Sequence, residues 1–297
     1  MKNNNILVSV IVVSYNSEKT IEETLNSIKS QSYDNIELII SDDGSKDNTI
    51  DICKRWLQIN GKVFSCYQLI TVELNSGIPA NCNRSLKASN ADWVKFIAGD
   101  DTLKRDCVKE NVKYINLHND IEVLQTSIDV YNENFNERSY QITRPNFSSH
   151  NFFEMEASKQ NNYLKNKNNP VCAPSIFLKK SVIERANGFD ERFTLMEDFP
   201  LWLNITRLGI KIHFLELATV NYRLHSKSII KSEKVNISAK FAKSYLYFLK
   251  NYFLPKDRNF KIKKDIFKFR VYIFLEKLGL NNNYILSKVL YAIVDKL

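Results

Sequence analysis

Pairs of adjacent acidic residues are the features of this sequence best suited to chemistry. They are Asp42-Asp43, Asp100-Asp101 and Glu197-Asp198. Each pair has an ordinary explanation, because Asp-Gly is a common turn and an Asp at a helix start is usually a cap. Hard divalent cations such as Mg²⁺ or Mn²⁺, however, are held by one or two carboxylates together with substrate phosphates. Taken together, the pairs indicate a metal ion that carries a nucleotide diphosphate.

The elements that must position these acids alternate between strands and helices. The continuous apolar run at 7–13, typical of a strand buried on both faces, predicts a first strand, and further strands are predicted at 35–41, 66–74 and 92–98. Apolar spacing, capping residues and a first-turn proline predict helices within 18–31, 46–60 and 78–89. This alternation predicts an α/β fold, with a mostly parallel, Rossmann-like central sheet and helices on both faces. Ligands of such sheets bind at the carboxyl ends of the strands, where the first two acidic pairs fall.

The second half of the chain gives a weaker signal. We expect a strand in 121–132, a polar irregular stretch in 138–169, and a strand followed by a short helix in 175–193. A helix opened by acids is expected in 197–209, followed by two short strands, 210–215 and 218–224. From Ser232 onward the pattern favours two or three basic amphipathic helices, with Leu254-Pro255 as a break.

Charge is distributed unevenly along the 297 residues. The net charge is +9, yet residues 231–297 carry 15 Lys/Arg against 5 Asp/Glu, and residues 1–230 carry 27 against 28. A basic tail favours an anionic surface, which could be a lipid headgroup layer or a nucleic acid. A solvated basic helix pair without a partner is the alternative. No recognisable nucleic-acid module is present, so we expect no nucleic-acid partner.

Cysteine usage and hydropathy indicate the compartment. The five cysteines are odd in number and contain no CxxC pair, which favours a reducing cytosol over a disulfide framework. The N-terminal segment lacks the charged start and cleavage site of a signal peptide. No segment reaches the ~18 to 20 apolar residues of a membrane span. We therefore expect a cytoplasmic protein that, if membranes matter, lies on the inner face of the cytoplasmic membrane.

Six motifs in order resemble the family 2 glycosyltransferases of the GT-A fold. They are "VSVIVVSYNSEKTIEETLNSIKSQSYDNIELIISDDGSKDNT", "NSGIPANCNRSL", "WVKFIAGDD", "GFDERF", "EDFPLWL" and "YRLHSKS". The resemblance covers roughly residues 6–228. It implies a catalytic domain at 1–230, with a nucleotide-sugar half at 1–120 and an acceptor half at 121–230, followed by a helical extension at 231–297.

The resemblance also implies roles for individual residues. Those expected to contact the nucleotide are Val13, Tyr15, Asp42, Asp43, Asn83 and Asp100. Those expected at a Mn²⁺ or Mg²⁺ ion are Asp101, Asp100 and His225. Asp198 matches the catalytic base of the family, and Glu197 is the neighbouring acid expected to orient the acceptor.

Two positions depart from the family pattern. Ala98 stands where the first acid of the usual acidic motif is found, so metal binding must rest on Asp100 and Asp101. Cys82-Asn83 stands where Arg-Asn is frequent, so a phosphate or base contact is either missing or moved to Arg84. Arg223 is a second candidate for the diphosphate, because its guanidinium suits phosphate geometry.

The expected reaction is inverting transfer of a sugar from a UDP-sugar donor to a hydroxyl of an acceptor glycan. A polyprenyl-diphosphate-linked sugar, as used in bacterial O-antigen or capsule assembly, fits a protein with a basic peripheral tail. A catalytically silent nucleotide-sugar-binding protein is the alternative, because of Ala98 and Cys82. A dinucleotide-binding dehydrogenase is disfavoured, since no GxGxxG follows the first strand.

Overall fold

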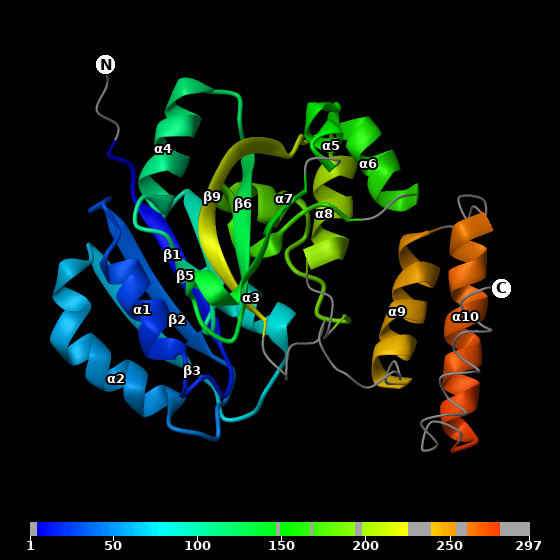
Figure 1. The fold of residues 1–297 in the computed structure, drawn as a ribbon, viewed down its shortest axis with the longest axis horizontal. Coiled ribbons are helices and arrows are strands. Elements are labelled where there is room, and N and C mark those ends of the chain that lie inside the picture. Colours follow the sequence, from blue (N-terminus) through cyan, green and yellow to red (C-terminus); the bar gives the residue numbers. More distant parts are fainter. Residues whose placement is uncertain are drawn as a thin grey trace.

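The structure is a computed structural model that describes residues 5–146, 149–166, 169–193, 198–224, 239–253 and 260–279. One mixed sheet forms its centre, and helices cover both faces of it (Figure 1). The α/β class expected from the alternating pattern is thereby confirmed.

Four parallel strands make up the N-terminal half of the sheet. They are β1 (Val8–Ser14), β2 (Ile36–Asp42), β3 (Cys66–Thr71) and β4 (Trp93–Ala98), in the spatial order β3-β2-β1-β4. The helices between them are α1 (Ile21–Lys29), α2 (Thr49–Asn60) and α3 (Ile78–Ala88). In the register of the sheet, Ser14 lies beside Asp42 and Val13 beside Ala98, so β1, β2 and β4 end at the same edge.

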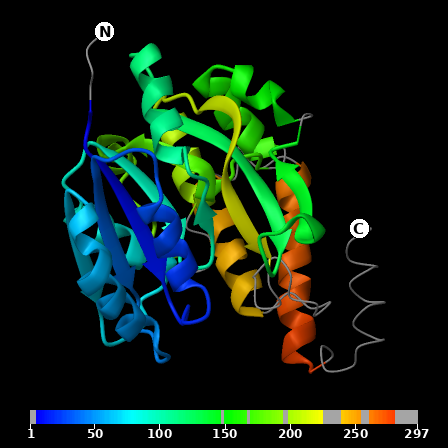
Figure 2. The same cartoon turned by 60° about the vertical axis from the view of Figure 1, so that its left-hand side comes forward.

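The sheet continues past β4 with strands of both directions. Antiparallel β8 (Ile176–Lys179) is followed by β6 (Val123–Asn132), then β9 (His213–Leu224) and the short β5 (Thr102–Leu103). A further strand, β7 (Tyr140–Arg144), pairs with β6. Since β8 is antiparallel to both β4 and β6, strands β4 and β6 run in the same direction, and β9 runs parallel to β6. The end of β9 (yellow in Figure 2) therefore reaches the same edge of the sheet as the end of β4.

Alternation along β1 divides the core into two clusters. Val8, Val10 and Val12 pack against α1, α2 and α4 (Cys107–Leu117), whereas Ile11 belongs to the cluster on the opposite face. That second cluster contains side chains of α3, α7 (Lys180–Arg185), α8 (Asp198–Arg207), α5 (Asn151–Glu154) and α6 (Ala157–Asn166). Full burial of one aliphatic side chain contributes about 1.5–3 kcal/mol, so these clusters supply the main driving force for the fold.

The second half differs from its sequence expectation in three ways. The stretch expected to be irregular, 138–169, holds β7, α5 and α6. The two short strands expected at 210–215 and 218–224 form the single strand β9, whose pairing with β6 shifts register twice. A bulge adds residues to one strand without ending the ladder, which explains why the sequence pattern looked interrupted. Helix α4 follows the acidic loop and was not expected from the sequence.

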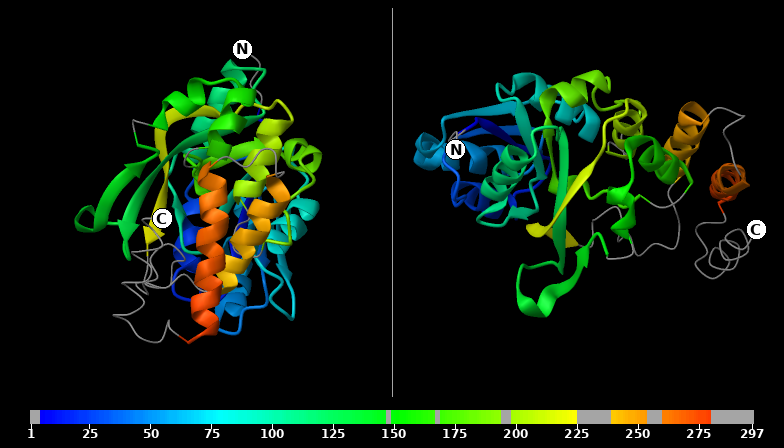
Figure 3. Two further views of the ribbon diagram at one scale, coloured as in Figure 1. Left: turned by 90° about the vertical axis from the view of Figure 1, so that its right-hand side faces the viewer. Right: turned by 90° about the horizontal axis from the view of Figure 1, so that it is seen from above.

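Two helices beyond residue 238 pack onto this core. They are α9 (Ala239–Tyr252) and α10 (Phe260–Lys277). Phe248 and Leu249 of α9 and Ile262 and Ile266 of α10 belong to the same buried cluster as α8. In Figure 3, α9 lies between α10 and the rest of the described fold, and α9 and α10 pack side by side. The expected break at Leu254-Pro255 lies outside the described residues.

Among the described helices, none is both long enough and apolar enough to cross a membrane. All five cysteines lie in described segments, and no disulfide joins them.

Candidate functional site

Two of the three acidic pairs meet at the carboxyl end of β1. The amide of Asp43 donates to the carbonyl of Ser14 at 3.0 Å, and the amide of Gly99 donates to the carbonyl of Val13 at 3.0 Å. Asp42-Asp43 and Asp100-Asp101 therefore flank one strand end, as the sheet topology predicts. The half-buried side chain of Val13 packs against the core, so its contribution at this edge comes from its backbone.

The carboxylate of Asp42 is fully buried and is used within the protein. It accepts hydrogen bonds from the Ser14 hydroxyl at 3.0 Å, the Ser45 amide at 2.8 Å and the Ser45 hydroxyl at 2.6 Å. These bonds close the Asp-Gly turn after β2, in which Gly44 has a φ of +78° that favours glycine. In this structure Asp42 shapes the loop that carries Asp43.

Asp43 faces the start of α3. Its carboxylate accepts hydrogen bonds from the Ser76 amide at 3.0 Å, the Ser76 hydroxyl at 2.6 Å, the Gly77 amide at 2.7 Å and Arg84 Nη2 at 3.1 Å. Burial raises the pKa of Asp43, but these hydrogen bonds outweigh burial and hold the pKa below its usual value. The pair of Asp43 and Arg84 is thus charged and fixed in place.

Tyr15 is the aromatic side chain at this edge. It follows β1 directly and is 46% exposed. The next residue, Asn16, has a φ of +52°, and its amide donates to the Ser45 hydroxyl at 2.7 Å, which turns the chain away from the sheet. The exposed ring of Tyr15 is therefore available to a planar ligand such as a nucleobase.

The loop Ala98–Asp101 is held tightly by α1. The Thr20 hydroxyl donates to the carbonyl of Gly99 at 2.7 Å, and the Thr24 hydroxyl donates to the carbonyl of Asp101 at 2.7 Å. A Cβ added at Gly99 would lie 3.1 Å from Ile21 Cδ1 and 3.1 Å from Ser17 Oγ. A side chain at this position would be tightly packed against α1 and the end of β1, which favours glycine before the two aspartates.

Arg223, at the end of β9, clamps this loop. Its amide donates to Asp101 Oδ1 at 2.8 Å, and its Nε donates to the carbonyl of Asp100 at 2.8 Å. The rest of the guanidinium hydrogen-bonds the carboxylate of Glu23 on α1 and the carbonyl of Glu133 after β6. The guanidinium also lies 4.1 Å from the ring centre of Phe135. Arg223 is thereby occupied in fixing the two aspartates.

Asp101 retains one carboxylate oxygen without a partner. Its Oδ2 is buried and makes no hydrogen bond in the described part of the chain. Burial raises the pKa of Asp101 well above its usual value, the neighbouring Asp100 raises it further, and the Arg223 amide and the charge of Lys95 only partly offset this. An orphaned buried carboxylate oxygen is costly unless a cation satisfies it.

The acidic loop fits a divalent cation that completes its shell with substrate oxygens. Mg²⁺ typically binds through one or two carboxylates, water and phosphates. Within the described segments, no group of three or more His, Cys, Asp or Glu side chains could hold a metal ion alone, and Ala98 adds no ligand. Asp101 and Asp100 are the residues that would hold the cation. His225, expected as a further ligand, lies outside the described residues.

Asp198 begins α8. Its Oδ1 accepts a hydrogen bond from the amide of Phe199 at 2.7 Å, and burial raises the pKa of its carboxyl above the usual value. A carboxylate whose pKa is raised is a better proton acceptor near neutral pH. Glu197, expected to orient the acceptor, lies outside the described residues.

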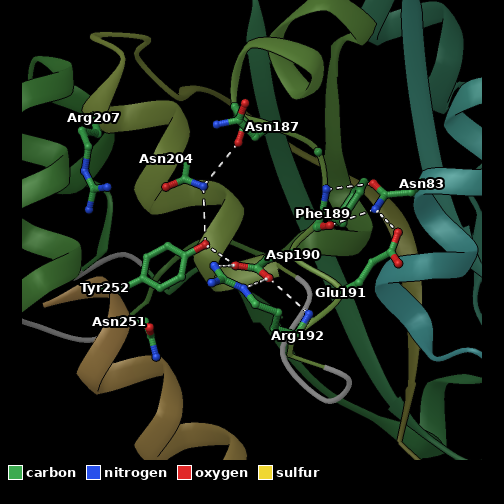
Figure 4. Close-up of a pocket in the computed structure, with 12 residues that line it drawn as sticks. Asn83, Asn187, Phe189, Asp190, Glu191, Arg192, Asn204, Arg207, Asn251 and Tyr252 are labelled. Carbon is green, nitrogen blue, oxygen red and sulfur yellow. Dashed lines mark hydrogen bonds and ion pairs between the residues drawn. The ribbon is translucent and has the colours of Figure 1, made fainter.

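Asn83 lies in a cavity of about 490 Å³ that Figure 4 shows between α3, the Gly188–Phe193 segment, α8 and α9. Its Nδ2 donates to the carbonyl of Phe189 at 2.8 Å and to Glu191 Oε1 at 2.8 Å, and its Oδ1 accepts from the Phe189 amide at 2.9 Å. None of the four aspartates at the strand edge lines this cavity. The structure therefore places Asn83 as a brace for the Gly188–Phe193 segment, whereas its neighbour Arg84 reaches Asp43.

Some residues of the site were not expected from the sequence. Thr20, Thr24 and Glu23 hold the acidic loop from α1, and Tyr252 of α9 donates to Asp190 Oδ2 at 3.0 Å. Thr20, Glu23 and Thr24 are spaced three and four residues apart and so share one helical face. This spacing is the feature of the sequence that could have indicated their common role. Nothing in the sequence links Tyr252 to Asp190, because 62 residues separate them.

Comparisons with known proteins agree with this geometry. The family model described as glycosyl transferase family 2 matches residues 9–186. EpsE of Bacillus subtilis (strain 168), named as a glycosyltransferase, is 29% identical over 218 residues, which are 73% of this chain and 72% of that protein. The Escherichia coli protein named UDP-Glc:alpha-D-GlcNAc-diphosphoundecaprenol beta-1,3-glucosyltransferase WfaP is 28% identical over 225 residues, covering 75% and 79% of the two chains.

Solved structures share the fold. Residues 1–349 of S. aureus TarS in complex with UDP-GlcNAc align with a TM-score of 0.63 and 20% identity, over 91% of this chain and 73% of that one. The mannosyltransferase PcManGT of Pyrobaculum calidifontis, in complex with GDP-Man and Mn²⁺, aligns with a TM-score of 0.60 and 17% identity, over 97% and 74%. At these identities the likeness concerns the fold.

Proposed function

This chain belongs to glycosyl transferase family 2, and from that premise we propose that it transfers a sugar from a UDP-sugar to a hydroxyl of a lipid-diphosphate-linked sugar, with inversion. The observation that carries the proposal is the acidic loop at the end of β4. It holds Asp100 and Asp101 beside the end of β1 and leaves Asp101 Oδ2 buried, with no hydrogen-bond partner among the described residues. The divalent cation that accompanies a nucleotide diphosphate would supply the positive charge that this loop lacks.

Three observations support a uridine nucleotide as the donor. TarS, which shares the fold, has been solved with UDP and with UDP-GlcNAc. The exposed Tyr15 ring offers a surface on which a base can stack. Arg84, which Asp43 fixes near the end of β2, is partly exposed and can donate a hydrogen bond to a nucleotide. PcManGT was solved with GDP-Man, so the donor screen below also includes GDP-Man, and transfer from GDP-Man but from no UDP-sugar would contradict the choice of uridine.

The proposed reaction is a single displacement. The acceptor oxygen forms a bond to the anomeric carbon of the donor, the bond from that carbon to the β-phosphate oxygen breaks, UDP leaves, and the hydroxyl proton passes to Asp198. When bound, the divalent cation neutralises the charge that develops on the leaving diphosphate. Asp100 and Asp101 would hold that cation, and Arg223 and the α1 threonines keep the two aspartates in place. One displacement inverts the anomeric centre.

The acceptor class is inferred from relatives. WfaP and a second Escherichia coli relative, WfgD, are both named for transfer to GlcNAc-diphosphoundecaprenol, and WfgD is 28% identical over 201 residues. A lipid-linked acceptor is also consistent with the basic C-terminal region of this chain. A free glycan hydroxyl would use the same chemistry.

A catalytically silent nucleotide-sugar-binding protein is the second candidate. Ala98 favours it, because the acidic loop offers two carboxylates where the family pattern has three. This candidate predicts nucleotide binding without turnover.

A donor screen tests the proposal. Purified protein with Mn²⁺ or Mg²⁺ is incubated with UDP-Glc, UDP-Gal, UDP-GlcNAc, UDP-GalNAc or GDP-Man and a short-chain lipid diphosphate-sugar, and the product is analysed by mass spectrometry and NMR. We expect transfer from at least one UDP-sugar, with the anomeric configuration of the new bond inverted. Absence of both transfer and donor hydrolysis, together with UDP binding by calorimetry, would contradict the proposal and favour the silent binder.

A further inference from the structure

Helix α10 carries apolar side chains on two opposite sides. One side packs inward and buries Ile262, Ile266, Phe269, Tyr272 and Leu275, spaced three and four residues apart. This spacing forms the stripe with which a surface helix normally covers a core. The inward side therefore accounts for the packing of α10, and the apolar side chains on its other side need a separate explanation.

The opposite side of α10 forms a second stripe with the same spacing. We call Lys263, Phe267, Arg270, Phe274 and Lys277 the α10 stripe. At about 100° per residue, steps of four, three, four and three residues keep these side chains within one narrow sector of the helix. Cations and phenylalanines thus alternate along a single face.

The α10 stripe is exposed. Phe267 is 54% exposed and Phe274 is 59% exposed, and Lys263, Arg270 and Lys277 are also exposed. In the parts of the chain that the structure describes, the three cations form no salt bridge with any acidic side chain. Figure 3 shows α10 on the side of α9 that faces away from the central sheet. Two large apolar side chains on one exposed helical face mark an interaction surface rather than ordinary solvent contact.

Charge decides which partner fits this surface. A second copy of the chain would bring three more cations against the first three, which opposes self-association through this face. An anionic bilayer offers negative headgroups for the cations and an apolar boundary for the aromatic rings. Interfacial helices combine these two side-chain types in the same way.

We propose that the α10 stripe is the surface by which this protein lies on an anionic lipid bilayer, with Phe267 and Phe274 entering the headgroup region. The inference deepens the proposed function and rests on it for its purpose, because a lipid-linked acceptor is itself presented at a membrane. It names the side chains that make the contact, whereas the charge of residues 231–297 gives only a general tendency.

Sedimentation with vesicles tests the inference. Full-length protein is mixed at low salt with vesicles of phosphatidylcholine alone, or of phosphatidylcholine with about one third phosphatidylglycerol. We expect the protein to pellet only with the anionic vesicles, since each basic residue near such a surface multiplies the partition coefficient by roughly five. Lys263→Gln/Arg270→Gln/Lys277→Gln and Phe267→Ser/Phe274→Ser should each reduce the partition coefficient by at least about tenfold.

The matched control lies on α2, where Arg55 and Ile59 also place a cation and an exposed apolar side chain four residues apart. Ile59 is 80% exposed. Arg55→Gln/Ile59→Ser should pellet like the unchanged protein. Circular dichroism and melting temperatures should match for all variants, because every altered side chain is exposed.

Several outcomes would overturn the inference. Wild-type protein that stays in the supernatant with anionic vesicles would do so, as would stripe variants that pellet as well as wild type. Dimerisation in light scattering that Phe267→Ser/Phe274→Ser abolishes would identify the stripe as an interface between copies. Transfer to a water-soluble acceptor analogue is measured in parallel. Transfer without sedimentation defeats this inference alone, and sedimentation without transfer from any donor defeats the proposed function alone.

Discussion

Asp101 is a buried carboxyl group with two unlike oxygens. Oδ1 accepts a hydrogen bond from the backbone of Arg223, and Oδ2 accepts none in the described residues. Burial and the neighbouring Asp100, only partly offset by Arg223 and Lys95, raise the pKa of Asp101, which favours the protonated form until a cation approaches. The free energy cost of this arrangement is recovered only when a ligand supplies positive charge, so it is the property expected of a binding group.

Replacing the carboxylate with an amide tests this interpretation. Asp101→Asn keeps the shape of the side chain and can still accept from the Arg223 amide, but it removes the negative charge. We expect UDP binding in the presence of Mn²⁺ to weaken by at least about tenfold, the loss of roughly one charge-assisted contact. Calorimetric titrations with and without Mn²⁺ should then give nearly equal affinities for the variant.

The control for this titration is Asp51→Asn, an acid on the exposed surface of α2 that pairs only with Lys54 among described residues. It should bind UDP with the wild-type dependence on Mn²⁺. If Asp101→Asn also kept that dependence, the aspartate pair would serve only to form the turn.

At this scale the sequence predicted which residue types meet, and tertiary contacts decided what each one does. The strand ends placed Asp42, Asp43, Asp100 and Asp101 together, as expected from topology. The partners of Asp43 and Asp101, however, are Arg84 and Arg223, which lie 41 and 122 residues away in the chain. No local pattern encodes such pairs. Asn83 and Asp42 likewise form their hydrogen bonds within the protein, which the local sequence does not predict.

The elements show how helix α9 contacts the segment that precedes Asp198, the proposed base. Tyr252 of α9 donates to Asp190 Oδ2 at 3.0 Å, and the ring of Phe193 lies 5.7 Å from Phe248 and 5.6 Å from Tyr252. Asp190 and Phe193 belong to the segment that precedes Asp198 in the chain. We infer that α9 positions this segment, so that a helix outside the matched family region, 9–186, influences the base.

Removing one hydroxyl measures this positioning. Tyr252→Phe keeps the ring against Phe193 and loses the hydrogen bond to Asp190, which is worth about 1–3 kcal/mol as a bond to a charged group. We expect the transfer rate kcat to fall by about two- to tenfold, with little change in KM for the donor. The melting temperature should fall by a few degrees.

Tyr67→Phe is the control, because it removes the same hydroxyl from an exposed tyrosine on β3, away from α9. It should leave kcat and KM unchanged. A Tyr252→Phe protein with normal kcat and a lowered melting temperature would assign Tyr252 to stability alone.

The elements were predicted best where the alternation is regular. Strands β1, β2 and β4 coincide with apolar runs, because a strand that is buried on both faces is apolar along its length. Strand β3, at the edge of the sheet, was also predicted, although most of its side chains are exposed. Strand β7 and helices α5 and α6 were not predicted, since the 138–169 stretch is polar. The buried face of α6 has helical spacing, but two of its four buried residues, Gln160 and Asn161, are polar, so no apolar stripe marks the helix. The bulged pairing of β9 with β6 made one strand resemble two.

The whole molecule separates two kinds of charge. Residues 1–230 are nearly neutral and hold the acidic strand edge, whereas residues 231–297 carry a net charge of +10. Because α9 and α10 pack onto the same core cluster as α8, the basic region is joined to the catalytic half. The proposed lipid-contacting surface of α10 and the proposed cation site at the strand edge therefore belong to one packed structure.

The proposed role of Asp198 depends on its own carboxyl group, on helix α8, which it begins, and on the fold of the family. Burial raises the pKa of its carboxyl, and the base must be deprotonated to accept a proton. The rate of transfer should therefore rise as the pH increases through that pKa. The acid limb of the pH profile should lie above the ordinary Asp pKa of about 3.9. A variant without a titrating group at this position should lack that limb.

The most direct test of the proposed mechanism is the kcat of transfer by Asp198→Asn, measured across pH with the donor that the screen identifies. A general base contributes at least about 10²-fold, so we predict a fall in kcat of that size or more, with donor affinity retained and the acid limb gone. Asp51→Asn should behave as wild type. A kcat for Asp198→Asn within threefold of wild type would contradict the assignment of Asp198 as the base.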